Sequence, residues 1–465
     1  MQTVPRVAGA AGFHFCRFFL LFLCSLVLAG CPAPPPHYED PPDLRRMSQD
    51  PLSYVAPENY HHVLLPPDVQ QQRAAEFLDL FFLPWQPTWQ PVSKSKAYWP
   101  LETFSKEEAF VALGRPRPAE WLTDMSRQAR FDSYPSLDQP GIILRNTDCR
   151  ALPDRQPAFF DPQRAGEGYP FDYLQNSALW GGTPVRVLHR SADQAWLFVQ
   201  SPLVYGWVET SDVAFVDADF AAAYQTGDYA AITHDRLPLI DEDGQFRFLG
   251  RIGSLYPLLD GGDSLLVPAA AADGRAVLRK VPMPSAGVSP FPLEASEENL
   301  ALTARELMNE PYGWGGLNLT RDCSAMTRDL LAPFGIWLPR NSLQQARAGE
   351  LVDLTGFSPA DRERLILSQG IPFLTLLYRP GHIMLYLGTA QNDGVIMHDL
   401  WGLKTNTRCG EGRRVIGRTV ITSLHPGAGV AELARPQGEL LPALKTMTIV
   451  GRVPYHWSES EESEQ

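Results

Sequence analysis

The sequence predicts an α+β multidomain chain, in which a mainly helical N-terminal domain precedes two small β-barrels and a C-terminal domain of mixed helices and strands. Its 465 residues are too many for one hydrophobic core. Helical patches rich in proline and tryptophan give way near residue 141 to short alternating strands, and helical periodicity returns near residue 296. The predicted parts are an apolar leader (1–30), a proline-rich tether (31–50), the helical domain (51–140), the barrels (141–213 and 214–288), the C-terminal domain (289–457) and an acidic, disordered tail (458–465).

The leader has the form of a bacterial export signal. Arg6 and Arg17 are followed by an apolar run that is too short to span a bilayer. Leu28-Ala29-Gly30-Cys31 resembles the lipobox of bacterial lipoproteins, which implies cleavage before Cys31 and lipidation of its thiol. The mature chain would then be anchored to the envelope on the periplasmic side. Pro32 after the cysteine favours the outer membrane, and an ordinary secreted protein is the alternative.

Charge and cysteine content exclude some partners and leave one question open. The formal net charge of -13 argues against nucleic acid as a partner. Two of the six cysteines lie in the leader and a third is Cys31, which leaves Cys149, Cys323 and Cys409. An odd number of thiols in an exported protein indicates at least one free thiol. A Cys149–Cys409 disulfide stays possible, because the sequence does not fix the distance between the two.

The middle of the chain favours strands over helices. A helical patch at 69–82 belongs to the N-terminal domain, and short alternating segments begin after Gly141. The motifs Asn146–Pro153 and Tyr205–Val208 resemble a bacterial SH3-like domain. Weaker strand and turn markers between 228 and 281 indicate a second such barrel.

The C-terminal domain carries a cysteine in a setting that suits a nucleophile. Ser296 is placed to cap an opening helix, and Asp322 to cap a second helix whose first turn contains Cys323. The positive end of that helix would favour the thiolate. A buried, inert cysteine is the simpler alternative.

Two histidines follow at a spacing that fits a base and its orienting partner. Strands are predicted at 371–378, 382–387 and 395–400, with the second hairpin centred near residue 390. This register would put His382 roughly opposite His398, so that one imidazole serves as base and the other holds its tautomer. A Cys-His-His zinc site is a rival, but the chain has no Cys-x-x-Cys or His-Glu-x-x-His motif to support it.

Several motifs in order resemble the NlpC-type cell-wall cysteine peptidases, over about the last 170 residues. They are Tyr312-Gly313-Trp314-Gly315-Gly316, Asp322-Cys323-Ser324, Leu338-Pro339-Arg340-Asn341-Ser342 with Gln345, and Gly381-His382 leading into Leu385-Tyr386-Leu387-Gly388. The resemblance implies a papain-like fold with Cys323 as nucleophile, His382 as general base and His398 as the orienting residue. No metal or organic cofactor is implied.

The same resemblance implies further roles around the thiol. The Tyr312 hydroxyl would assist the oxyanion, while Asp322, Ser324 and Ser342 would line a pocket for the amine and the D-glutamyl carboxylate of the substrate. Ser342 fits a helix N-cap equally well.

The order of the parts resembles the γ-D-glutamyl-L-diamino-acid endopeptidases, which hydrolyse peptidoglycan stem peptides (murein tri- or tetrapeptides). That subgroup implies a first barrel that narrows the site to peptides with a free N-terminal L-Ala, and Tyr205 would contact the amine. An acidic residue expected near residues 179–182 is absent, since Gly182 stands there. The alternatives are a non-catalytic lipoprotein that binds wall peptides, and an amidase or acyltransferase on the same fold.

Overall fold

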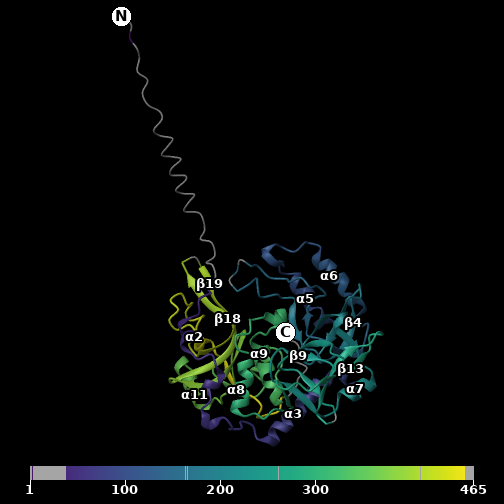
Figure 1. Cartoon of the computed structure of the whole chain (residues 1–465). Coiled ribbons are helices and arrows are strands. Elements are labelled where there is room, and N and C mark those ends of the chain that lie inside the picture. The colour runs from purple at the N-terminus through teal and green to yellow at the C-terminus, as the bar shows by residue number, and fades with distance from the viewer. Residues whose placement is uncertain are drawn as a thin grey trace.

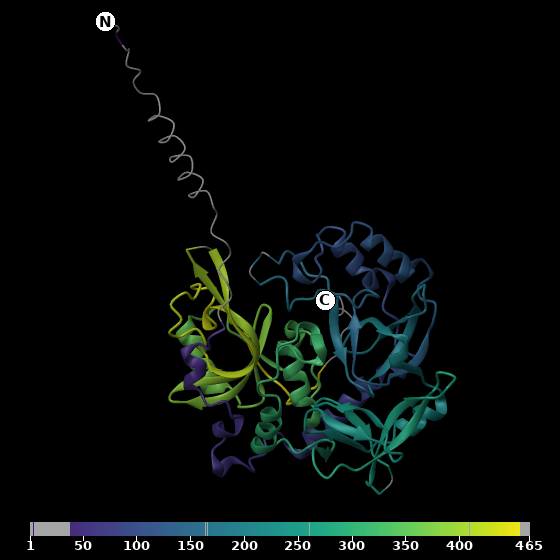
Figure 2. The ribbon, with the colours of Figure 1, turned by 45° about the horizontal axis from the view of Figure 1, so that its top comes forward.

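The computed structural model describes residues 3, 38–162, 164, 166–259, 261–408 and 410–455. The predicted signal peptide, the lipidated Cys31, the Cys149–Cys409 disulfide and the tail at 458–465 therefore lie wholly or partly outside the described residues. The described chain forms one assembly of barrels and C-terminal domain, with the N-terminal helices wrapped around it (Figures 1 and 2). The predicted α+β multidomain class is confirmed.

The N-terminal helices do not build a separate core. They are α2 (Pro42–Arg46), α3 (Pro67–Phe81), α4 (Lys94–Ala97), α5 (Trp99–Phe104) and α6 (Trp121–Ala129). The apolar face of α3 packs on Trp337 of the C-terminal domain, whereas α5 and α6 share a core with the first barrel through Phe198 and Trp207. Figure 1 accordingly shows α3 and α6 on opposite sides of the molecule.

The predicted tether is shorter than expected, because its second half is docked. The Asp40 carboxylate accepts a hydrogen bond from Arg418 at 2.9 Å, and buried Asp43 accepts from the backbone N–H and the hydroxyl of Ser423 at 2.8 and 2.9 Å. Gln49 donates to the carbonyl of Ile421 and accepts from its N–H. These polar contacts fix residues 40–50 against the edge of the C-terminal sheet.

The first barrel is an antiparallel sheet in the order β3-β2-β6-β5-β4-β1-β7. Its strands are β1 (Gln139–Ile143), β2 (Thr147–Arg150), β3 (Gln175–Leu179), β4 (Pro184–Arg190), β5 (Trp196–Gln200), β6 (Tyr205–Glu209) and β7 (Val213–Phe215). Side chains alternate along β6. Tyr205 and Trp207 face the core shared with the N-terminal helices, and Val208 faces the barrel interior.

The second barrel is built from smaller pieces. Helix α7 (Ala218–Tyr224) connects it to the first, and its strands pair as β10-β9, β11-β8-β14 and β12-β13. These are β8 (Tyr229–Ile232), β9 (Leu237–Ile240), β10 (Phe246–Gly250), β11 (Leu255–Pro257), β12 (Ser264–Ala270), β13 (Ala276–Pro282) and β14 (Val288–Pro290). Buried Phe248 and Tyr256 fill its core.

The C-terminal domain packs helices on an antiparallel sheet in the order β15-β20-β16-β17-β18-β19. The helices are α8 (Glu297–Glu306), α9 (Cys323–Leu331), α10 (Ser342–Gln345) and α11 (Pro359–Gln369). The strands are β15 (Glu350–Asp353), β16 (Thr375–Arg379), β17 (His382–Ala390), β18 (Asp393–Thr407), β19 (Gly410–Ser423) and β20 (Thr446–Ile449). The caps predicted for Ser296 and Asp322 are confirmed, since each side chain accepts from the N–H three residues on.

The strand predicted at 395–400 is far longer than expected. It continues to Thr407 and forms a long hairpin with β19, visible as the yellow-green arm in Figure 2.

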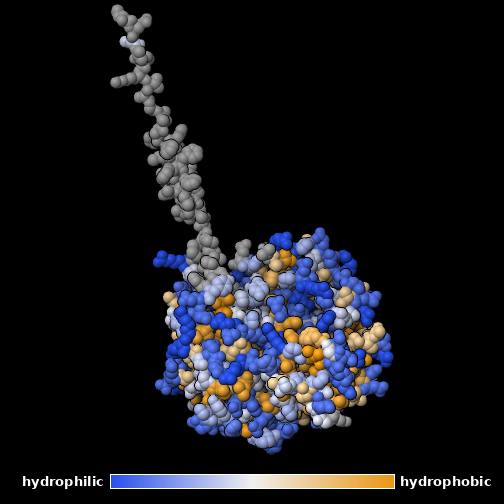
Figure 3. All heavy atoms as spheres, in the orientation of Figure 1, coloured by the Kyte–Doolittle hydropathy of each residue, from blue (hydrophilic) through white to orange (hydrophobic). Residues whose placement is uncertain are grey.

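The face shown in Figure 3 mixes hydrophilic and hydrophobic residues. No helix in the described ranges combines the length and the hydrophobicity that a membrane span requires.

A buried ion cluster joins the three larger parts around α9. The Arg321 side chain is fully buried and donates to Asp235 of the second barrel at 2.9 Å, to Glu310 at 2.6 Å and to Asp329 of α9 at 2.7 Å. Trp180 of the first barrel donates its indole N–H to the same Asp329 at 2.9 Å. One guanidinium thus ties both barrels to the helix that begins with Cys323.

Replacing this arginine should destabilise the whole assembly. Arg321→Met removes the cation that the three buried carboxylates share and leaves them Arg251 and Arg328 as their closest cationic partners. We therefore expect a loss of about 3–5 kcal/mol and a clearly lower midpoint of thermal unfolding. The matched control is Arg305→Met, which removes an exposed pair with Asp50 and should cost at most about 1 kcal/mol. Equal midpoints for the two variants, measured by circular dichroism, would contradict the importance of the cluster.

Candidate active site

The Cys323 thiol sits at the start of α9, where the helix meets β17. The Asp322 side chain caps the helix by accepting from the N–H of Ala325 at 2.9 Å. Cys323 is 7 % exposed, and the backbone N–H of Ile383 donates to its sulfur. Because Ile383 follows His382 directly, the cap and this bond hold the thiol beside the start of the strand that carries the first histidine.

Two neighbouring cavities lie at this point, and together they are called the cleft here. The thiol cavity, of about 440 Å³, is lined by Cys323, and the histidine cavity, of about 270 Å³, by His382 and His398. Tyr312 and Gly381 line both. The thiol and the imidazoles therefore line neighbouring cavities that share part of their walls.

A hydrogen-bond chain fixes which nitrogen of His382 is the base. The Thr422 hydroxyl donates to the carbonyl of Ser423 at 2.9 Å, so its oxygen can only accept from Nε2–H of His398, 3.2 Å away. His398 Nδ1 is then an acceptor, and Nε2–H of His382 donates to it at 3.0 Å. This arrangement leaves the Nδ1 lone pair of His382 available as a base.

The histidines are diagonal neighbours and do not lie opposite each other as predicted. Leu385 pairs with Met397, which places His398 across from Met384. The turn lies at Gln391 and Asn392, whose φ angles of 52° and 70° are left-handed, and β17 has a bulge between Tyr386 and Gly388. The prediction assumed a turn centre near residue 390 and no bulge. The diagonal still brings the rings together, with centroids 5.2 Å apart.

The wall of the thiol cavity is a closed polar network. Arg340 donates to both carboxylate oxygens of Asp322, at 3.1 and 2.7 Å, and to the Ser324 hydroxyl at 2.9 Å. Gly315 N–H adds a further donor to Asp322 at 3.0 Å. Arg340 lies in the Pro-Arg-x-Ser motif, but sequence reasoning gave it no role.

Four family models match successive parts of the chain. They are the N-terminal stabilising domain of NLPC_P60 proteins (residues 15–134), an SH3 domain of SH3b1 type (157–209), an SH3 domain of SH3b2 type (217–261) and the NlpC/P60 family (309–400). The last match contains Cys323, His382 and His398. The C-terminal domain thus matches the NlpC/P60 family, and the order of the four matches agrees with the predicted resemblance.

One solved structure agrees with the order of the family models. An NlpC/P60 endopeptidase from Photobacterium damselae subsp. piscicida is 25% identical, with 90% of this chain and 100% of that chain covered and a TM-score of 0.82. An NlpC/P60 family protein from Bacillus cereus is 16% identical, with 64% and 98% covered and a TM-score of 0.43. The search of curated proteins found no match.

Protonation in this NlpC/P60 site differs from the predicted thiolate. Burial, with a smaller contribution from the Asp322 carboxylate, raises the pKa of Cys323 to about 12. Burial, with Arg379 nearby, lowers the pKa of His382 to about 3, and the pKa of His398 is lowered well below its usual value for the same main reason. The resting site therefore pairs a neutral thiol with neutral imidazoles, since desolvation outweighs the helix terminus.

Tyr312 and Ser342 both lie on the cleft. Burial raises the pKa of the Tyr312 hydroxyl well above its usual value, so this group stays a hydrogen-bond donor. Ser342 is the first residue of α10 and lines the thiol cavity, while Asn341 takes the N-cap position. The capping role considered for Ser342 is therefore wrong.

Tyr205 is not where the predicted amine contact requires it. Its ring packs in the core beside Phe198, and its hydroxyl donates to the carbonyl of Lys96 at 3.5 Å. Strand alternation turns Tyr205 away from the cavity, whose wall is formed by Tyr173 of the barrel and Trp99 of α5. Gly182 also lies elsewhere, because its carbonyl accepts from Tyr224 at the junction of the two barrels.

Sequence reasoning missed Trp99, Tyr173 and Thr422 as parts of the site. Tyr173 lies in an aromatic-rich stretch before β3, which was the one available signal. The positions of Trp99 and Thr422 depend on contacts between distant segments, so no local pattern marks them. Among the described residues, no group of three or more His, Cys, Asp or Glu side chains could hold a metal ion.

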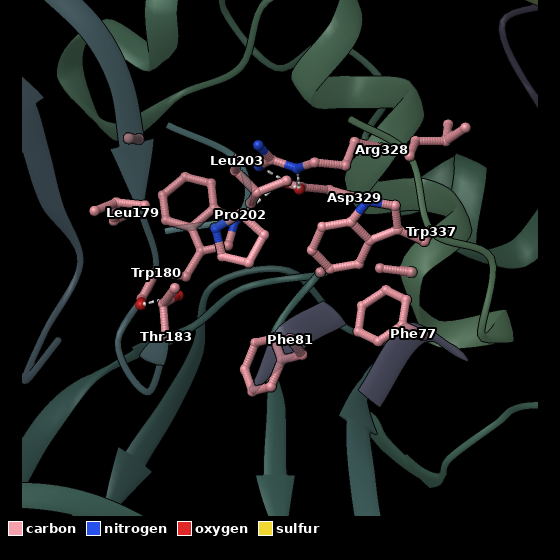
Figure 4. A pocket seen from close by; sticks show the side chains of 14 residues that line it. Phe77, Phe81, Leu179, Trp180, Thr183, Pro202, Leu203, Arg328, Asp329 and Trp337 are labelled. Carbon is pink, nitrogen blue, oxygen red and sulfur yellow. Dashed lines mark hydrogen bonds and ion pairs between the residues drawn. The ribbon is translucent and has the colours of Figure 1, made fainter. Parts of the chain in front are cut away.

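A third cavity lies away from the chemistry, at the other end of α9 (Figure 4). Phe77 and Phe81 of α3, Trp180 of the first barrel and Trp337 line it, together with Arg328. Arg328 and Asp329 pair at 2.6 Å on its wall. This cavity therefore lies at the interface between α3, the first barrel and the C-terminal domain.

The raised pKa of Cys323 can be tested by alkylation. We expect iodoacetamide to modify Cys323 at pH 8 about 100-fold or more slowly than glutathione, because little thiolate is present. The rate should rise by about tenfold per pH unit between pH 8 and 10. Mass spectrometry of the Cys323 peptide separates it from Cys149, and a rate that is already level at pH 7 would contradict the neutral resting thiol.

Proposed function

We propose that this NlpC/P60 protein is a cysteine endopeptidase that hydrolyses the γ-D-glutamyl–diamino acid bond of peptidoglycan stem peptides and releases L-Ala-D-Glu. The observation that carries the proposal is the convergence, in one cleft, of a helix-start thiol and an imidazole whose tautomer is set by His398 and Thr422. The similarity to the Photobacterium endopeptidase supports the reaction class.

The reaction begins with removal of the thiol proton. Nδ1 of His382 takes the proton as the Cys323 sulfur attacks the γ-carbonyl carbon of D-Glu. The Cys323 N–H, in the first turn of α9, and the Tyr312 hydroxyl donate to the oxyanion. His382 then gives its proton to the nitrogen of the diamino acid, the C–N bond breaks, and a thioester remains. Water hydrolyses the thioester to the free carboxylate.

The walls of the thiol cavity limit the length of the substrate on the N-terminal side of the bond that is cleaved. Trp99 and Tyr173 bound the cavity on the side of the N-terminal helices and the first barrel. A peptide that begins with L-Ala would end there, whereas one still joined to a glycan would meet the wall. We assign Ser342 to the D-glutamyl carboxylate and Asp322 with Ser324 to the amine, since these side chains line the cavity.

Hydrolysis and its selectivity can be tested together. The chain from residue 32 onward is incubated with L-Ala-γ-D-Glu-diaminopimelate and with its N-acetylated form, and products are identified by mass spectrometry. We expect cleavage of the free-amine peptide only, and a loss of about 10³-fold or more in Cys323→Ala. Cleavage of both peptides would discard the size limit, and cleavage of neither would favour a wall-binding lipoprotein or a different amide or ester substrate.

We also propose that the protein is exported and anchored by lipid at Cys31, on the periplasmic side of the outer membrane if the host is Gram-negative. The lipobox pattern supports this location. Radiolabelled palmitate should be incorporated into the full chain and not into Cys31→Ser. Equal labelling of the two chains would contradict the anchor.

A further inference from the structure

The two cavities receive different halves of the substrate, if the proposed function holds. The sulfur of Cys323 bonds to the acyl carbon, so the acyl half lies in the thiol cavity. His382 protonates the leaving nitrogen, so the leaving half lies beside His382 in the histidine cavity. The side chains of the histidine cavity therefore contact the diamino acid and determine which diamino acids are accepted.

The histidine cavity is positively charged in an acidic protein. Arg379 at the end of β16, Lys404 on β18 and Arg413 on β19 line it, and no Asp or Glu does among the described residues. The chain as a whole has a formal net charge of -13. In the thiol cavity, by contrast, the lining arginine is already paired with the lining aspartate. The positive charge is thus concentrated on the leaving side of the cleft.

Arg379 and Lys404 provide the charge relevant to binding. Lys404 contacts Glu411 at 2.7 Å, and the same carboxylate also contacts Arg413 at 3.1 Å, so it does not serve Lys404 alone. Arg379 forms no ion pair or hydrogen bond with another described side chain, although its side chain is partly buried. An arginine that is partly removed from water gains most from a carboxylate, which can accept two parallel N–H bonds.

We propose that the histidine cavity is a carboxylate subsite, in which Arg379, supported by Lys404, binds a free carboxylate of the leaving diamino acid. Two groups have this chemistry, the α-carboxylate of a terminal diamino acid and the side-chain carboxylate of a diaminopimelate residue. The subsite makes the enzyme selective for anionic leaving halves. Amidated stem peptides, and lysine-type peptides if the side-chain carboxylate is the one bound, are poor substrates.

The test compares three forms of one tripeptide, with both carboxylates of the diaminopimelate residue free, with the α-carboxylate amidated, and with the side-chain carboxylate amidated. We expect one of the two amidations to lower kcat/KM of the wild type about tenfold or more, which identifies the carboxylate bound. Arg379→Gln should lower kcat/KM about tenfold on the free tripeptide, through KM, and remove the preference for that carboxylate. Lys404→Gln should weaken the preference in the same direction.

The matched control is Arg408→Gln, which removes the same charge from an exposed position near the tip of the β18–β19 hairpin. It should leave the preference unchanged. Three results would overturn the subsite: a wild type indifferent to both amidations, an unchanged preference in Arg379→Gln, or a loss in Arg379→Gln that is equal for free and amidated peptides and so acts through His382. Failure of the wild type to cleave any of the three peptides would instead refute the proposed function.

Discussion

The position of the catalytic helix depends on one buried guanidinium. Arg321 directly precedes the capping Asp322 and satisfies carboxylates from the second barrel, from the loop before the Gly-rich motif and from α9 itself. Buried ion clusters of this kind are costly to break and geometrically strict. These bonds therefore fix the position of the barrels relative to the thiol. They also fix the position of the aromatic walls of the cleft.

In the cleft, the charged side chains and the groups that exchange a proton are different residues. The permanent charges, at Asp322, Arg340, Arg379 and Lys404, lie to either side of the reacting groups. The thiol and the imidazoles are neutral at rest, because burial disfavours their charged forms.

The features that the sequence predicted well are those with local signals. The cap at Asp322, the helix of Cys323 and the strand of His382 follow from neighbouring residues, and the motif order led to the correct family. The diagonal placement of the histidines depends on a bulge, which no pattern in β17 reveals. Tyr205 illustrates a different limit, since the strand was predicted correctly but the face that meets the cleft depends on how α5 and the barrel pack.

The walls of the cleft come from segments that lie far apart in the sequence, and Trp99 is the clearest case. One wall comes from a helix near the start of the sequence, and Leu440, which lines the other end of the cleft, lies close to its finish. The cleft can therefore form only after these distant segments have packed together, so a partly folded chain has no complete substrate-binding wall.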